Sequence, residues 1–159
     1  LELKKFSDEV DLLFGLTVER PRRSLMSGEE ILSLALALGM RLNRRGVFVM
    51  NEEGRELFTL ENRDATPFVA QELKEQEILG ITFLLDVTTV SDMTRTFNKM
   101  TGVAKQFADA MNASICDDNS QVVSESGLDV IRQQLNKINQ RMEELEILPG
   151  SLVAKQLFS

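Results

Sequence analysis

Alternation of apolar and polar residues, together with β-forming residues and turn signals, predicts six strands along the chain. In a sheet with one buried face every second side chain is apolar, and this pattern is clearest from Leu79 to Val87. Arg45–Met50 and Leu57–Asn62 are expected to form a hairpin with a loop of four to five residues around the turn sequence Asn51 to Gly54. The predicted strands cover residues 10–18, 45–50, 57–62, 79–87, 113–116 and 121–123.

Three further segments repeat apolar residues at three- and four-residue intervals, which is typical of amphipathic helices. They cover residues 28–38, 90–111 and 125–146. Ser27 and Glu30 have capping-box spacing before the first helix, and Gly39 is suited to end it. Ser91 or Thr89 is the expected cap of the second helix, and Ser124 that of the third. No single element is predicted for residues 65–76, which are interrupted by a proline; a short helical turn is one option.

This order of elements predicts an α+β fold with two layers. Strands joined by short turns favour a largely antiparallel sheet of about six strands, with three α-helices on one face and the other face open. Residues 1–147 are expected to form a single domain, and residues 148–159 a tail that is docked or flexible. The apolar stripe of the third helix has two interpretations, a core-facing stripe or a coiled-coil seam for self-association.

The amino-acid composition excludes several kinds of catalytic and metal site. The 159 residues include no His, Trp or Tyr and a single Cys, Cys116, so His-dependent catalysis, an internal disulfide and a thiolate zinc site are excluded. The net charge of −7 argues against nucleic-acid binding. We therefore expect no enzyme activity, no cofactor and no small-molecule substrate.

The remaining polar candidates each have an ordinary structural interpretation. Asp117 and Asp118 fit a tight turn better than a metal site, and Asp86 fits a solvated strand end better than a catalytic acid. Six arginines are grouped in the sequence as Arg20, Arg22, Arg23, Arg41, Arg44 and Arg45. They are either solvated loop charges or a basic patch that docks an acidic peptide.

The predicted open face of the sheet is unexpectedly apolar. If the strongest apolar positions face the helices, Leu13, Val47, Val49 and Leu84 face the other way. Apolar side chains clustered on neighbouring strands suggest a shallow groove for a ligand or peptide.

Several segments together resemble the C-terminal domain of the bacterial cell-division protein family ZipA. They are LFTLEN at 57–62, GITFLLDV at 80–87, residues 97–104, Ala108-Asp109, Cys116-Asp117-Asp118, and the first helix between Gly28-Glu29 and Gly39. The similarity runs from about Val10 to Leu145.

The resemblance implies a non-catalytic adaptor that binds the C-terminal tail of FtsZ on the open sheet face and ties the division ring to the inner membrane. A soluble, monomeric domain at the cytoplasmic face of that membrane is implied, with a membrane anchor in an N-terminal region missing from a chain that begins at Leu1. Carried over residue by residue, the peptide-binding set is Leu13, Arg45, Val47, Glu61, Arg63, Ala65, Thr82 and Leu84.

The groove implied by the resemblance is more polar here than in the family. Arg45 and Arg63 stand where well-known members have Met, and Ala65 where a Lys is usual. Asp11 replaces an apolar residue, and Ser120 an Arg. The alternatives to the adaptor are a self-associating structural module and an enzyme or small-ligand domain using Asp86 or the 117–118 turn.

Overall fold

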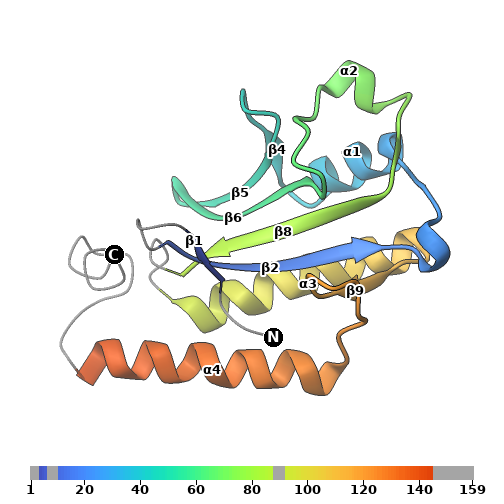
Figure 1. The fold of residues 1–159 in the computed structure, drawn as a ribbon. Helices are drawn as coiled ribbons and strands as arrows, with labels where there is room; N and C mark the ends of the chain where they lie inside the picture. The colour runs from blue at the N-terminus through green and yellow to red at the C-terminus, as the bar shows by residue number, and fades with distance from the viewer. Residues whose placement is uncertain (1–3, 7–10, 88–91, 145–159) are drawn as a thin grey trace.

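A computed structural model describes residues 4–6, 11–87 and 92–144, with nine strands and four α-helices in this part of the chain (Figure 1). The strands are β1 (Lys4–Phe6), β2 (Asp11–Glu19), β3 (Met26–Ser27), β4 (Arg41–Leu42), β5 (Phe48–Glu52), β6 (Arg55–Asn62), β7 (Glu77–Ile78), β8 (Gly80–Asp86) and β9 (Ser114–Cys116). The helices are α1 (Gly28–Ala37), α2 (Ala70–Leu73), α3 (Met93–Met111) and α4 (Glu125–Glu144), with a 3-10 turn, η1, at Pro21–Arg23.

Seven of the strands form one sheet in which every pairing is antiparallel. Its order is β1-β2-β8-β6-β5-β4, and β9 pairs with β2 beyond the end of β1. β3 and β7 form a separate two-stranded sheet. The predicted α+β class and antiparallel sheet are confirmed.

One face of the sheet carries the core. Its side chains form a single apolar cluster with buried residues of α1, α3 and α4. Phe14 of β2 meets Phe97 of α3 edge-on with ring centroids 5.4 Å apart, and Phe83 of β8 meets Phe107 of α3 at 5.6 Å. Such pairs add to the burial of large apolar surfaces, so α3 and the central strands form the centre of the fold.

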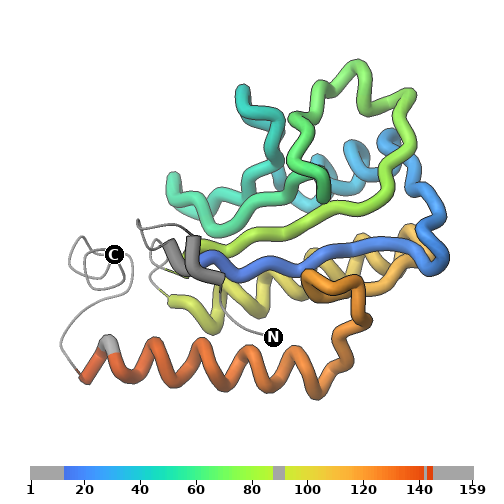
Figure 2. Tube along the Cα trace, viewed as in Figure 1, coloured from blue at the N-terminus to red at the C-terminus, as the bar shows by residue number. Residues whose placement is uncertain are grey.

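The third long helix, α4, packs on α3 rather than on the sheet. Figure 1 shows α3 between the sheet and α4, and the colours of Figure 2 trace the chain from one helix to the other. Leu128, Ile131 and Leu135 of α4 are buried in the common core. The apolar stripe of α4, which also fitted a coiled-coil seam, therefore packs inside the domain.

The predicted ends of the helices are largely confirmed. Ser27 Oγ accepts the backbone N–H of Glu30 at 3.3 Å, and Gly39 ends α1 with φ at +94°. Ser124 Oγ accepts the N–H of Gly127 before α4. The cap of α3 is different: Asp92 accepts the N–H of Arg95 at 3.0 Å, and the expected caps at 89 and 91 lie outside the described residues.

Three other expectations need correction. The β5–β6 hairpin turns in two residues, Glu53 and Gly54, both with positive φ, instead of four to five. Residues 121–123 form one isolated bridge, Cys116 to Val122, and no strand.

The third correction concerns residues 65–76, which contain α2, a one-turn helix anchored by buried Leu73. This helix raises the number of helices in the described chain from three to four. The tail at 148–159 and the boundary at 147 lie outside the described residues.

Replacing Ile131 by Ala should destabilise the domain by about 2–5 kcal/mol, because it removes a fully buried side chain at the α3–α4 contact. Val130→Ala is the matched control, since Val130 on the same helix is 52% exposed, and it should change stability by less than about 0.5 kcal/mol. Urea unfolding measures both. Equal, small effects would show that α4 does not pack on α3.

Candidate functional site

The candidate site is the face of the sheet turned away from α3. Strand register places its side chains in rows that cross the strands. Gly15, Leu84 and Thr59 form one row, and Val49 continues it on β5. Cys116, Thr17, Thr82 and Glu61 form the next row. Among the described residues no helix is seen over these rows (Figure 1).

A shallow hollow of about 200 Å³, here called the apolar hollow, lies at one end of this face. Leu13, Val47, Leu57, Thr59 and Leu84 are only partly buried there. The complete lining is Leu13, Arg45, Val47, Glu56, Leu57, Phe58, Thr59, Leu84 and Asp86. Apolar side chains that remain partly accessible on adjacent strands are suited to bind an apolar partner.

Two local features shape the apolar hollow. Gly15 lies opposite Leu84, and a Cβ at Gly15 would come within 3.1 Å of Leu84 Cδ2, so the missing side chain lets Leu84 lie over β2. A β-bulge between β5 and β6 leaves Leu57 without a partner, because Met50 pairs with Phe58 and Asn51 with Glu56. Bulges redirect side chains near binding sites.

The row next to the apolar hollow is polar. The hydroxyls of Thr17 and Thr82 are hydrogen bonded across β2 and β8 at 3.0 Å. Glu61 lies beside Thr82 and is half-buried. Burial raises the pKa of the Glu61 carboxyl above its usual range, because a charged carboxylate is poorly solvated there.

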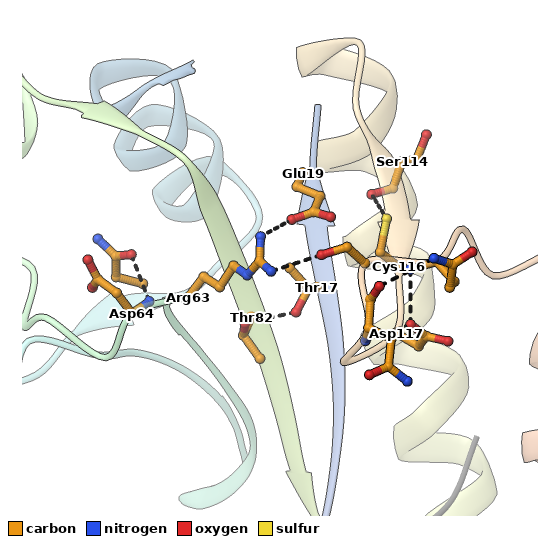
Figure 3. Close-up of polar contacts among 12 residues, drawn as sticks. Thr17, Glu19, Arg63, Asp64, Thr82, Ser114, Cys116 and Asp117 are labelled. Atoms are coloured by element: carbon orange, nitrogen blue, oxygen red, sulfur yellow. Dashed lines mark hydrogen bonds and ion pairs between the residues drawn. The ribbon is translucent and has the colours of Figure 1, made fainter. Parts of the chain in front are cut away.

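The far end of the same face is charged. A second hollow of about 290 Å³, here called the basic corner, is lined by Glu19, Arg20, Pro21, Arg22, Arg23, Arg63, Ser114, Cys116 and Ser120. Figure 3 shows Arg63 reaching across β8 to form an ion pair with Glu19, and its guanidinium donates to Ser120 Oγ at 2.9 Å. The stem of Arg63 passes over Gly80, where a Cβ would stand 3.0 Å from Arg63 Cδ.

Two groups with reactive potential have structural surroundings. Burial, followed by the nearby Glu19 carboxylate, raises the pKa of the Cys116 thiol to about 11, so it is protonated and weakly nucleophilic at neutral pH. The Asp117 carboxylate accepts backbone N–H groups from Asn119 at 2.8 Å and Gln121 at 3.0 Å (Figure 3), which confirms the turn interpretation. Within the described residues no group of three or more Cys, Asp or Glu is placed to hold a metal.

Residues 12–134 match the family described as ZipA, C-terminal FtsZ-binding domain. The chain belongs to this family. The cell division protein ZipA of Colwellia psychrerythraea (strain 34H) is 25% identical over 114 residues, which is 69% of this chain and 30% of that protein. The match therefore covers less than a third of the length of this ZipA relative.

The structure brings together only part of the residue set implied by the resemblance to ZipA. Leu13, Arg45, Val47 and Leu84 line the apolar hollow. Glu61 and Thr82 lie in the polar row, and Arg63 lines the basic corner. Ala65 is exposed in the turn after β6, with φ at +67°, and lines neither the apolar hollow nor the basic corner.

The outer face of the domain differs from the sequence-based expectation in two further ways. Val49, expected to be accessible, is only 7% exposed, so it contributes little contact surface. Leu57 and Thr59 line the apolar hollow but were absent from the expected set. Alternation along residues 57–62 places Leu57 and Thr59 on the same face as Glu61, whereas the bulge that leaves Leu57 unpaired has no sequence signal. Asp11 lies in β2, and its side chain is outside the description.

The described helices do not have the character of membrane spans. None is both long enough and apolar enough to cross a bilayer.

Glu61→Gln should stabilise the domain at pH 7. Because burial places the folded pKa of Glu61 above the ordinary value of 4.5, its ionisation destabilises the fold at neutral pH. This penalty disappears as the pH falls below 4.5, where Glu61 is protonated in both states.

Urea unfolding of wild type and variant at pH 7 and near pH 4 measures the effect. The advantage of Glu61→Gln should be larger at pH 7 than near pH 4. Glu56→Gln, at an exposed position of the same strand, is the control for the chemical change from carboxylate to amide. An equal effect of Glu61→Gln at both pH values would contradict the assigned burial of the carboxylate.

Proposed function

We propose that this domain is a non-catalytic adaptor that binds the C-terminal tail of FtsZ in the apolar hollow. The observation that carries the proposal is the partly accessible apolar surface of Leu13, Val47 and Leu84 on a sheet face without helical cover in the described chain. Membership of the FtsZ-binding domain family of ZipA supports FtsZ as the partner.

The shape of the apolar hollow favours a short peptide over a folded partner. A tail segment can place two or three apolar side chains in the hollow and leave the rest of its length on the neighbouring strands. Burial of about 300 Å² of apolar surface on each side, at ~25 cal/mol/Å², is a substantial gross gain. Ordering a flexible tail offsets much of it. We therefore expect weak binding, with a Kd of roughly micromolar.

Charge at the edge of the apolar hollow adds a smaller contribution. Arg45 is exposed, and its guanidinium lies 4.0 Å from Glu56, a weak surface pair. Arg63 is engaged by Glu19 and Ser120, so Arg45 is the better candidate to meet an acidic residue close to the apolar anchors. Such contacts mainly affect association rate and salt dependence.

The adaptor function also includes a membrane connection. We propose that the whole protein ties the division ring to the cytoplasmic face of the inner membrane through a segment outside this chain. Many FtsZ tails along one polymer would each bind weakly and together hold the protein firmly, because later binding events are intramolecular.

Self-association through the third helix is less well supported than peptide binding. Leu128, Ile131 and Leu135 of α4 are buried against the domain's own core. A coiled-coil partner would have to displace α3 from these residues. We therefore propose a monomeric domain.

Leu84→Glu should weaken binding of the FtsZ tail at least about tenfold, because a carboxylate replaces the central apolar side chain of the hollow. Fluorescence polarisation with a labelled tail peptide from the same organism measures the affinity. Because Leu84 is partly exposed, the melting temperature should change little.

Leu36→Glu is the matched control for this experiment. Leu36 is 43% exposed on α1 and receives the same substitution away from the apolar hollow. It should leave peptide affinity unchanged. Equal affinities for wild type and Leu84→Glu would exclude the apolar hollow as the binding site.

A further inference from the structure

The basic corner carries an excess of positive charge on an acidic protein. Its lining contains four arginines and one glutamate, whereas the chain as a whole has a net charge of −7. The six arginines grouped in the sequence do not form one patch. Arg20, Arg22 and Arg23 follow β2, whereas Arg41, Arg44 and Arg45 lie around β4, at the opposite edge of the sheet.

The four guanidiniums of the basic corner are held in different ways. Arg63 is neutralised by Glu19. Arg20 donates its Nε to the carbonyl of Met111 at 2.6 Å and another N–H to the carbonyl of Leu25, which fixes the side chain without neutralising its charge. Arg22 and Arg23 are exposed, and neither has an ion pair with a residue of the described chain. Three arginines without a carboxylate partner among the described residues thus line the same hollow.

The backbone holds Arg22 and Arg23 in an uncommon conformation. Their φ angles are +59° and +56°, a left-handed region that side chains with a Cβ seldom adopt outside Asn and Asp. The turn therefore presents two arginines at positions where Asn or Gly would fold more easily.

The basic corner and the apolar hollow lie on the same sheet face, separated by the row of Thr17, Thr82 and Glu61. Leu13 lines the apolar hollow and Glu19 lines the basic corner, six residues further along β2. At about 3.3 Å per residue in a strand this separation is roughly 20 Å. An extended peptide bridges it with about six residues.

We propose that the basic corner binds carboxylate side chains, or the terminal carboxylate, of the same tail whose apolar residues occupy the apolar hollow. This inference rests on the proposed function and adds a chemical requirement to it. The tail should carry acidic groups about five or six residues from its apolar anchors. The guanidinium group pairs well with carboxylates because its planar N–H fork matches their two oxygens.

A peptide carboxylate fits the basic corner better than an anionic membrane does. The arginines line a recess that also contains Ser114 and Ser120, whose hydroxyls are hydrogen-bonding groups for a small anion. A bilayer is flat and attracts proteins through accessible clusters of Lys and Arg. The net charge of −7 would also oppose approach to an anionic surface.

The test uses the double variant Arg22→Asn, Arg23→Asn, because Asn tolerates left-handed φ and preserves the turn. The control is Lys137→Asn, Arg141→Asn, which removes the same charge from exposed positions of α4. Two labelled peptides serve as probes: the FtsZ tail of the same organism, and the same tail with Asp and Glu replaced by Asn and Gln and its C-terminus amidated.

The Arg22/Arg23 variant should bind the natural tail about three- to tenfold more weakly than wild type, with a shallower dependence on salt. It should bind the neutralised tail as wild type does, and the control variant should match wild type for both peptides. Circular dichroism and melting temperature should show that both variants fold.

Three results would overturn the inference. Unchanged affinity of the Arg22/Arg23 variant, while Leu84→Glu still weakens binding, would leave the proposed function intact and remove the basic corner from it. The variant could instead lose binding to vesicles of equal parts phosphatidylcholine and phosphatidylglycerol while its affinity for the tail is unchanged. That result would also remove the basic corner from the proposed function and assign the arginines to lipid binding. A wild-type chain that binds neither peptide would contradict both proposals.

Discussion

The structure depends on packing the sheet against α3 from one side only. Phe14 and Phe83 insert their rings between the sheet and α3, and α4 then covers the other side of α3 instead of the second face of the sheet. In an antiparallel sheet one face can remain in contact with solvent because the side chains alternate. Once all the long helices are on one side, the character of the other face is set by residues that have no role in the core.

Those residues form a gradient from apolar to charged side chains along the outer face. The apolar hollow lies at one end, the Thr17–Thr82 row is in the middle, and the basic corner is at the other end. Two glycines make the gradient possible, because Gly15 admits the side chain of Leu84 and Gly80 admits the stem of Arg63. A surface with apolar and charged ends suits an extended peptide, which can contact both with different residues.

The sequence predicts the two faces well and their details poorly. Side-chain alternation has a period of two, so a buried Phe83 requires an outward Leu84 once the strand is recognised. The four hollow-lining members of the expected set come from three separate parts of the chain. Alternation placed Leu13, Val47 and Leu84 on the open face, and the family resemblance added Arg45. Sequence spacing contains no comparable signal for the bulge at Leu57 or for the Arg63–Glu19 pair, whose partners are 44 residues apart. Such features arise from strand register, which is a property of the assembled sheet. Alternation places Val49 on the correct face but does not predict its burial, and Ala65 lies in the turn after β6, where strand alternation no longer applies.

The central claim is that the partner binds on the outer face of the sheet. An NMR titration of the ¹⁵N-labelled domain with the FtsZ tail peptide tests it most directly, because backbone amides report contact residue by residue. We expect the largest shift changes at Leu13, Val47, Thr82 and Leu84, with those of α1 and α4 nearly unchanged. Changes confined to α1 or α4, or none at a large excess of peptide, would contradict the account.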